Sequence, residues 1–531
     1  MPLEMKNSAS TDLLSSLPAV FKSTKERSQA VSRAVKAGKA RALGNTLYTT
    51  DLESDPAQLI QTRIWQVVAM LCPDCTIGYR TAIEGRPAQA GDRRFVVVVG
   101  SYPRRIDLPG LTIFQLAGLS PHGDDTPFLN EGLRIASEHR ALLENMLPSK
   151  GQHRRTLGRE AVEARLLAIL KSDRGHERLN QIRDRARKAA PALQLEPQFA
   201  ELDGMIGALL ETRPSELLKS ARPKAFVQGD GYDQVRLDLL AMLKLRLDSL
   251  LAVDRPEQQS EAAFRHAAFF DAYFSNFIEG TEFEVEEAKG IVLRGQIPKT
   301  RPADAHDILG TFDIVGSPAA MRNPPRDPVA LIDALKAHHA TIMKGRTDRR
   351  PGEFKETGNR AGGYEFVHPH EVLGTLRRGF EMMNGIDDPF SRAAFIMFLI
   401  AEVHPFDDGN GRTARAFMNA ELISRGQSRI IVPSVYRYEY LAGLGRMSRE
   451  RDPDTLIRVL DHAHAFTDAI DFTDLERATA TLDRCNAFKR PEDGIRLLWP
   501  PGAAVYDGGA RFAESAAKPA ADSGQQRERA G

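Results

Sequence analysis

Apolar residues spaced three or four positions apart predict that most of this chain folds as α-helices. The stretches LRIASEHRALLENML, residues 133–147, and REAVEARLLAILKSD, residues 159–173, carry this spacing, which gathers the apolar side chains on one helical face. In residues 391–403 almost every side chain is apolar, so this helix should be buried on all sides, with Ser391 as its N-cap. The pattern therefore indicates a mainly α-helical protein.

The first 130 residues combine helical and extended patterns. Helices are expected at 10–17 and 24–37, a β-like segment at 46–50 and a strand at 94–99. Between residues 22 and 41 only Glu26 is acidic, whereas seven residues are basic, namely Lys22, Lys25, Arg27, Arg33, Lys36, Lys39 and Arg41. Two helices, a hairpin and a basic face are typical of an α+β winged helix. The alternative is that these charges only solvate an exposed helical face.

Residues 220–234 cluster proline, glycine and charge after helical sequence, which indicates a domain boundary. From about Gly508 the chain holds almost no apolar residue, so disorder is expected there. A chain of 531 residues is also too long for a single core. The expected parts are an N-terminal domain at 1–130, a helical connector at 131–225, a second domain at 226–480 and an extension at 481–531.

The overall charge is close to neutral, with 72 Lys and Arg against 71 Asp and Glu. Binding to nucleic acid or to a membrane would therefore need a local patch. No run approaches the ~20 apolar residues of a spanning helix, and the N-terminus does not have the pattern of a signal peptide. A cytoplasmic protein without membrane association is the expectation.

Cys72 and Cys75 form a Cys-x-x-Cys pair, which is half of a zinc site or a redox dithiol. No second ligand pair lies nearby in the sequence, and Pro73 follows an apolar helix at 64–71 as an ordinary helix stop does. We expect a structural role for both cysteines.

The segment HPFDDGNGRTAR, from His404 to Arg415, combines residues that handle anions. Pro405 disfavours the α conformation at His404, so the buried helix should end there and aim the imidazole. Gly409 and Gly411 let successive backbone N–H groups point at one spot, and the helix beginning near Arg412 adds its positive N-terminal end. This concavity favours an anionic group.

Four side chains of the same segment extend this interpretation. Arg412 and Arg415 are three positions apart and project from one side of the helix, where each meets phosphate oxygens. Asp408 is a ligand for Mg²⁺ that bridges phosphates, while Phe406 anchors the loop in the core. The chemistry indicated is that of a metal-bound polyphosphate.

The segment matches the signature of the Fic family, His-x-Phe-x-(Asp/Glu)-Gly-Asn-Gly-Arg-x-x-Arg, at every defined position. Residues 334–343 and 351–372 also resemble that family's helix and flap hairpin. The resemblance implies an α-helical Fic core with a β-hairpin flap, which holds the target segment by strand addition. The flap residues implied to dock the target are Asn359, Arg360, Ala361, Gly362, Gly363 and Tyr364.

The resemblance also implies adenylylation, the transfer of AMP from ATP to a Ser, Thr or Tyr hydroxyl of a protein. His404 would take the hydroxyl proton, and Asp408 would hold Mg²⁺ on the phosphates. The residues implied to bind the nucleotide are Gly409, Asn410, Gly411, Arg412 and Arg415. The target is a protein of unknown identity or the chain itself, and a homodimer is left open.

A second match lies 125 residues upstream of His404. Ser275-Asn-Phe-Ile-Glu279-Gly280 resembles the family's inhibitory pattern, (Ser/Thr)-x-x-x-Glu-(Gly/Asn), and a helical pattern at 262–280 precedes it. By this resemblance Glu279 would pair with Arg415 in the place of the γ-phosphate, so that the resting enzyme is autoinhibited.

A looser resemblance covers about the first 130 residues. The stretch VKAGKARALGNTLYTT, residues 35–50, is similar to the recognition helix and wing of type IV abortive-infection antitoxins. It implies DNA binding through Arg33, Lys36, Lys39 and Arg41.

Three functions remain open from the sequence. The first is an autoinhibited protein adenylyltransferase. The second is a DNA-binding, antitoxin-like regulator that is controlled by self-modification. The third uses the same site in reverse, with Glu279 orienting a water that removes AMP from a modified protein.

Overall fold

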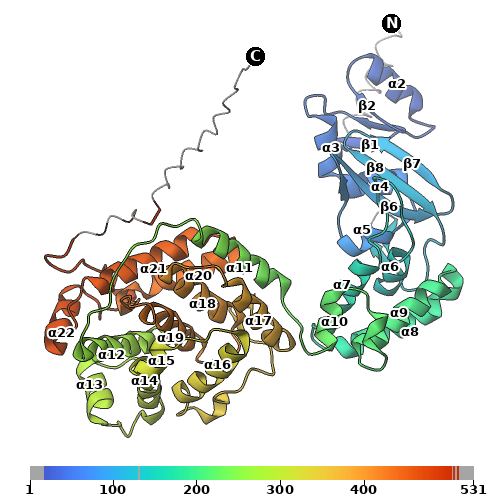
Figure 1. Ribbon diagram of the computed structural model, residues 1–531. Helices are drawn as coiled ribbons and strands as arrows, with labels where there is room; N and C mark the ends of the chain where they lie inside the picture. The colour runs from blue at the N-terminus through green and yellow to red at the C-terminus, as the bar shows by residue number, and fades with distance from the viewer. Residues whose placement is uncertain (1–16, 129–131, 505, 507, 509–510, 513–531) are drawn as a thin grey trace, which may run out of the picture. The chain divides into compact units, whose positions relative to one another are not determined.

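The computed structural model describes residues 17–128, 132–504, 506, 508 and 511–512 of the chain. Its contacts divide the chain into two compact units, Met1–Gln228 and Gly229–Gly531, shown in Figure 1. The helix expected at 10–17 lies outside the described residues except for Leu17. Within the described part, no helix has both the length and the apolar character needed to cross a membrane.

The first unit begins with a small antiparallel sheet and one helix. Strands β1 (Val20–Lys22), β3 (Leu47–Thr49) and β2 (Arg41–Gly44) lie side by side in that order. Helix α2 (Ser28–Lys36) packs its buried Val31 and Ala34 against Phe21 of β1. The helix expected at 24–37 and the extended segment at 46–50 are thus both present, which confirms an α+β N-terminal part.

A seven-stranded mixed sheet follows, with strand order β7-β8-β6-β4-β10-β9 and β5 paired to β6. Strand β6 is the strand expected at 94–99, and its Val96 and Val98 are buried against the helices next to the sheet. The elements are α3 (Pro56–Thr62), α4 (Ile64–Leu71), β4 (Thr76–Ile77), α5 (Tyr79–Glu84), β5 (Ala88–Ala90), β6 (Arg93–Gly100), β7 (Arg104–Leu108), β8 (Leu111–Ala117), β9 (Thr126–Phe128) and β10 (Leu133–Ile135).

One expected helix is corrected here. Residues 133–135 begin the helical pattern 133–147, but they form β10, which pairs with β4 on one side and β9 on the other. The helix of this stretch begins only at Glu138. The sheet supplies backbone partners on both sides, and this ladder overrides the local helical spacing.

The remainder of the first unit is helical and has its own core around Leu166, Leu179 and Met205. Its helices are α6 (Glu138–Asn145), α7 (Arg159–Leu170), α8 (Gly175–Leu193), α9 (Glu196–Leu209) and α10 (Ala221–Val227).

The second unit is a helical domain built around α18, which packs against α11, α17 and α19 (Figure 1). Its helices are α11 (Gln234–Leu247), α12 (Glu261–Ile278), α13 (Val285–Arg294), α14 (Pro302–Val315), α15 (Pro318–Arg322), α16 (Pro328–Ile342), α17 (Val372–Met382), α18 (Pro389–Val403), α19 (Asn410–Ile423), α20 (Arg437–Glu450), α21 (Pro453–Asp468) and α22 (Leu475–Arg484). A two-stranded hairpin of β11 (Arg360–Ala361) and β12 (Tyr364–Glu365) completes the unit. A mainly α-helical fold is thereby confirmed.

Helix α18 is buried along almost its whole length, as its apolar sequence predicts. Its N-cap is Asp388, however, and not Ser391: the Asp388 carboxylate accepts a hydrogen bond from the backbone N–H of Ser391 at 2.8 Å. Pro389 explains the difference, because proline suits the first helical position and moves the cap to the residue before it.

The expected disorder from Gly508 is wrong at Arg511. This side chain is buried, and its Nε donates to the carboxylate of Asp461 on α21 at 2.6 Å. Phe512 packs against the domain core next to it. One buried arginine and one packed aromatic ring are a signal too sparse for composition to reveal. Residues 513–531 lie outside the described part.

Candidate active site

The loop between α18 and α19 begins at His404, as the sequence predicts. His404 follows Val403, the last residue of α18, and adopts a left-handed backbone conformation with φ of 52°. Gly409, with φ of 75°, precedes the first residue of α19. A Cβ atom on Gly409 would lie 2.6 Å from the sulfur of Met343, so this position needs glycine for both its conformation and its space.

The protonation state of His404 suits a general base. Its Nδ1 lies 3.1 Å from the carbonyl oxygen of Ala401, and since a carbonyl only accepts, Nδ1 carries the proton and Nε2 is free to accept one. Burial lowers the pKa of His404 to about 4, although the Ala401 carbonyl opposes this. The imidazole is therefore neutral at pH 7.

A histidine of α16 that the sequence patterns do not single out packs against the loop. His339 of α16 stacks on Phe406, with ring centroids 3.7 Å apart. Its Nε2 lies 2.9 Å from the carbonyl oxygen of Asp408, and its Nδ1 accepts from the N–H of Gly352 at 2.9 Å. No motif marks His339, because its role depends on α16 lying beside the loop.

Asn410 and Asp408 have different surroundings. Asn410 is buried, and its amide accepts from the N–H of Phe406 and donates to that residue's carbonyl, both at 2.9 Å. It thus holds the loop closed. The carboxylate of Asp408 accepts from its own neighbour Gly409 at 2.7 Å, and 42% of the side chain is exposed.

Asp408 fits the way proteins hold Mg²⁺ in phosphate sites. No cluster of three acidic, histidine or cysteine side chains that would hold an ion unaided occurs among the described residues. Mg²⁺ in such sites is held by one or two carboxylates together with substrate phosphates and water, and an exposed carboxylate at an anion-binding loop meets that requirement.

Both arginines of the segment contact helix α12. The guanidinium of Arg415 is buried, and it donates to Ser275 Oγ at 2.9 Å and to Glu279 Oε1 at 2.7 Å. Arg412 is also buried, 3.3 Å from Asn276 Oδ1 and 3.2 Å from Asp307 Oδ2. The two arginines expected to meet phosphates are thus held by protein groups in this structure.

Glu279 occupies the position where an anion would approach the start of α19. Burial disfavours the charge of Arg415, but the Glu279 carboxylate and the Tyr440 hydroxyl together raise the arginine pKa. Glu279 Oε1 would lie only 2.0 Å from a Cβ atom on Gly411, so the carboxylate lies directly over that glycine. Gly280, with φ of 89°, follows and ends the helix.

These groups open into a cavity of about 450 Å³. His404, Gly411, Arg415 and Glu279 line one side. The hairpin with the residue after it, α18 and α20 supply the remaining lining residues, which are Ala361, Tyr364, Phe366, Phe398, Ala401, Glu402, Tyr440, Leu441, Leu444, Gly445, Ser448 and Arg449. The volume, and the mixture of apolar walls and convergent polar groups, suit a nucleotide.

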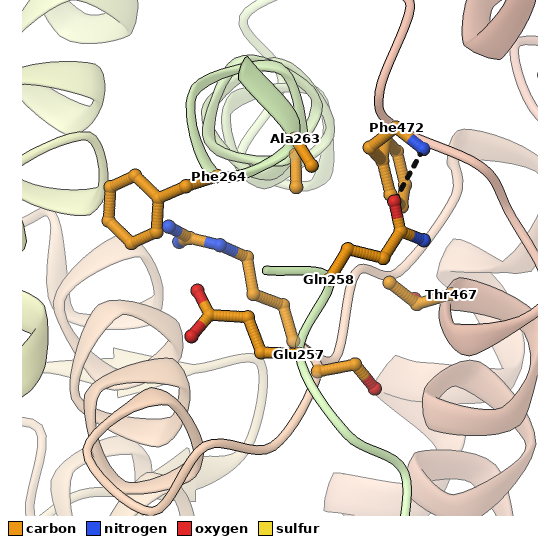
Figure 2. A pocket seen from close by; sticks show the side chains of 9 residues that line it. Glu257, Gln258, Ala263, Phe264, Thr467 and Phe472 are labelled. Carbon is orange, nitrogen blue, oxygen red and sulfur yellow. Dashed lines mark hydrogen bonds between the residues drawn. The ribbon is translucent and has the colours of Figure 1, made fainter. Parts of the chain in front are cut away.

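A second cavity, shown in Figure 2, holds only about 30 Å³. Gln258 lies in it and accepts a hydrogen bond from the N–H of Phe472 at 2.9 Å, while Phe264 and Arg429 pack at its edge. Such a volume admits one or two water molecules. We therefore assign the chemistry to the larger cavity.

Residues 330–422 match the Fic/DOC family. This region is a Fic domain. It spans α16 to α19 and includes the hairpin and the loop from His404 to Arg415, whereas α12 with Glu279 precedes it.

Known proteins resemble a larger part of the chain. The protein adenylyltransferase fic-1 of Caenorhabditis elegans is 28% identical over 192 residues, which cover 34% of this chain and 36% of that protein. The protein adenylyltransferase Fic of Drosophila grimshawi is 26% identical over 226 residues, 42% of this chain and 46% of that protein. The chain thus spans less than half the length of these relatives.

A solved structure of Fic-1 from C. elegans is 21% identical and covers 61% of this chain and 98% of its own. The TM-score is 0.34.

The flap hairpin of the Fic domain borders the cavity. Arg360 pairs with Glu365 and Ala361 with Tyr364, and Gly362 makes the turn with φ of 59°. Most of the implied docking residues are exposed, but two contact the domain: Asn359 donates to the carbonyl of Phe406 at 2.9 Å, and the Tyr364 hydroxyl donates to Glu402.

Tyr440 of α20 and Tyr436 in the turn before it have different surroundings. Tyr440 lines the cavity, with the Arg415 guanidinium 5.7 Å from its ring centroid. Tyr436 lies instead 5.0 Å from the ring of His462. Of the two, only Tyr440 is placed to contact a ligand of the Fic domain.

The basic residues of the first unit do not all share one environment. Arg33, Lys36 and Lys39 are exposed on α2 and in the turn after it. Arg41 is half-buried, and its guanidinium donates to the carbonyl of Ser54 at 2.6 Å. Arg41 therefore belongs to the structure of the small sheet.

Cys72 and Cys75 are both buried in the core of the larger sheet. A hydrogen bond from Cys75 lowers the pKa of Cys72 to about 7, against the effect of burial. Among the described residues no third ligand accompanies them to form a metal site.

Proposed function

We propose that this chain is a protein adenylyltransferase that transfers AMP from ATP to a hydroxyl group of a protein. The observation that carries the proposal is the placement of a neutral His404, with Nε2 free to accept a proton, in the same cavity as the buried cation of Arg415. The names of the two relatives, both protein adenylyltransferases, support this reaction.

In the proposed reaction, Nε2 of His404 takes the proton of a Ser, Thr or Tyr hydroxyl of the target. The hydroxyl oxygen forms a bond to the α-phosphorus, and the bond from that phosphorus to pyrophosphate breaks. Asp408 would hold Mg²⁺, which neutralises phosphate charge when bound. The positive end of α19, at Gly411, stabilises the negative charge that develops.

The phosphates that leave as pyrophosphate would meet Arg412 and Arg415. Both guanidiniums are buried, so each interacts with a phosphate more strongly than an exposed arginine does. Asn410 supports this arrangement by keeping the loop closed at Phe406. The target segment would lie along the flap, next to His404.

Glu279 would keep the resting enzyme inactive. Its carboxylate forms an ion pair with Arg415 and covers Gly411, where the nucleotide phosphates need to lie. ATP must therefore displace Glu279 or bind with its α-phosphate misaligned for attack. Movement of the C-terminal end of α12 would relieve the inhibition.

Labelling with ATP that carries radioactive phosphorus in the α-phosphate tests this function. With Mg²⁺ present, we expect weak labelling of protein by the wild type, strong labelling by Glu279→Gly and none by Glu279→Gly combined with His404→Ala. Absence of label from the Glu279→Gly variant, with itself and with cell extract as targets, contradicts the transferase. Release of AMP from labelled protein by the wild type, lost in Glu279→Gly, would instead indicate the hydrolase reaction.

We also infer that the first unit binds DNA. Arg33, Lys36 and Lys39 are exposed beside the hairpin of β2 and β3, and none of them has an acidic partner among the described residues. Cations without an acidic partner, on and just after a helix next to a hairpin, suit phosphate contacts along a DNA groove. Self-modification by the Fic domain would then regulate the binding.

Gel-mobility shifts test the DNA interface. We expect the affinity to fall with salt, and the slope of log K against log salt to shrink by about 0.9 for each phosphate that a variant no longer neutralises. Combined replacement of Arg33, Lys36 and Lys39 by alanine should reduce the slope, while Arg41→Ala at equal stability should leave it unchanged. Shifts that are absent, or that do not respond to salt, contradict the inference.

A further inference from the structure

The ring of Phe366 lies flat against the imidazole of His404. The two ring centroids are 3.8 Å apart, and the planes differ by only 8°. Phe366 directly follows strand β12 of the flap, and its backbone N–H donates to the carbonyl of Asn359 at 3.1 Å, which closes the lower end of the hairpin. The flap is therefore in direct contact with the group that the proposed reaction needs as its base.

This stacking completes the restraint of the imidazole. The Nδ1–H group of His404 is tied to the Ala401 carbonyl at the end of α18. Rotation of the imidazole about its Cα–Cβ bond would break that hydrogen bond and separate the ring from Phe366. One edge and one face of the imidazole are thus fixed by two different elements.

The backbone around His404 is also held from the flap side. Lys355 donates from its backbone N–H to the carbonyl of Pro405 at 2.9 Å and from Nζ to the carbonyl of Val403 at 3.3 Å. Lys355 Nζ also donates to Asn359 Oδ1 at 2.7 Å, and the Asn359 amide donates to the carbonyl of Phe406 at 2.9 Å. Two residues that precede the hairpin therefore bind the carbonyls on both sides of His404.

We propose that Phe366 is a positioning residue for His404, and that Lys355 and Asn359 hold the loop beneath it, so that the flap orients the catalytic imidazole as well as the target. This inference rests on the proposed transferase. Phe366, whose ring would aim the imidazole at the target hydroxyl, directly follows the hairpin that would bind the target segment. Binding of the target and orientation of the base would therefore depend on the same part of the chain.

Burial gives independent support. Phe366 excludes water from one face of the imidazole, and burial is the main reason that the pKa of His404 is lowered to about 4. The charged groups that face His404 are Lys355, which lowers this pKa further, and Glu279 and Asp408, which raise it. Loss of the phenyl ring admits water and shifts the pKa of His404 back towards its ordinary value.

Steady-state kinetics of full-length protein in the Glu279→Gly background test the proposal. Phe366→Leu should lower kcat by about tenfold or more, because a small misplacement of a reacting group costs that much, and should change KM for ATP by less than about twofold. The acid limb of the pH profile should move to higher pH. Phe366→Tyr keeps an aromatic ring that stacks on His404, so kcat and the acid limb of the pH profile should both stay as they are with Phe366.

The matched controls are an exposed aromatic residue and an exposed lysine of the same unit. Lys355→Met, which loses the Nζ hydrogen bonds to Val403 and Asn359, should lower kcat, whereas Tyr438→Leu and Lys299→Met should leave kcat unchanged. An unchanged kcat and an unchanged acid limb in folded Phe366→Leu would overturn the proposal. So would an equal loss of kcat in Phe366→Tyr.

A spectroscopic readout separates this proposal from the transferase itself. In protein with ¹³C-labelled histidine, the His404 signal is the one lost in His404→Gln, and stacking should displace it through the ring current of Phe366. Phe366→Leu should abolish that displacement. If Glu279→Gly transfers no AMP, the proposed function fails, but this signal still decides whether Phe366 holds the imidazole.

Discussion

Arg415 is central to the proposed activity, because two anionic groups would compete for its guanidinium. Glu279 binds it at 2.7 Å in this structure, and a nucleotide phosphate would bind it in the reaction. A buried guanidinium left without either partner would be costly, since its charge would be uncompensated. In the proposed enzyme, the same buried cation would stabilise the resting state through Glu279 and would bind phosphate once Glu279 moves.

Replacement of Glu279 by glutamine removes the competing charge and keeps the side chain's size. ATP should therefore raise the melting temperature of Glu279→Gln more than that of the wild type. A ligand at 100 times its Kd stabilises the folded state by about 2.7 kcal/mol. Differential scanning fluorimetry with and without ATP and Mg²⁺ measures the shift.

Arg415→Ala in the Glu279→Gln background is the control for this measurement, since it removes the cation and should abolish the shift. An equal shift by ATP in the wild type and in Glu279→Gln would show that the carboxylate does not compete with the nucleotide.

Single residues also show what the sequence reveals and what it conceals. The contact between Glu279 and Arg415 follows from two motifs, although 136 positions separate the partners. His339 and Phe366 lie within the two segments that resemble the family's helix and flap hairpin, but no pattern there marks either residue. They act through ring stacking on Phe406 and His404, which depends on how α16 and the flap pack around the loop.

At the scale of elements, α18, the loop and α19 form one buried unit, which His404 belongs to and which His339 of α16 contacts at Phe406. The burial of His404 and of His339 lowers the pKa of each to about 4. Periodicity and composition predict the burial of α18. They do not predict its exact start at Pro389 or the strand at 133–135, because a proline-directed cap and a sheet partner override the local pattern.

These two histidines should make the second unit sensitive to acid. Their pKa values in the folded state lie below the ordinary value of about 6.5, so the unfolded chain binds more protons between pH 4 and 6.5. Stability is therefore complete above pH 6.5 and falls as the pH drops towards 4, by up to about 3 kcal/mol for each histidine.

Melting temperatures across this range measure the effect. His339→Gln should be less stable at pH 7 and should show a weaker dependence on pH, whereas His370→Gln, at an exposed position, should keep the dependence of the wild type. Equal pH dependence in all three proteins would contradict the assignment of neutral, buried histidines.

At the scale of the whole molecule, the candidate active site lies entirely within residues 229–531. The two units have separate cores, one around Val96 and Leu111 and the other around Phe395 and Leu399. The boundary between the units, after Gln228, falls within residues 220–234, where charge, proline and glycine cluster. The composition of residues 220–234 thus coincides with the boundary between the units. The seven-stranded sheet of the first unit could not be predicted in the same way, because it depends on pairing between strands that are distant in the sequence.

A fragment of residues 229–531 should therefore fold and react alone. With Glu279→Gly it should label itself, or an added target, at a rate within about twofold of the full chain, because it retains every group of the cavity. Initial rates of labelling at matched concentrations measure this. A folded fragment without activity would place an essential group in the first unit.

The position of Glu279 directly over Gly411 also fixes how the proposed enzyme responds to its surroundings. A carboxylate on the same chain as its arginine acts at a constant effective concentration, which dilution of the protein does not change. The basal activity of each molecule should thus be independent of the protein concentration. A rise in the ATP concentration should relieve the inhibition by Glu279 only gradually. A partner that draws the end of α12 away would instead act as a switch.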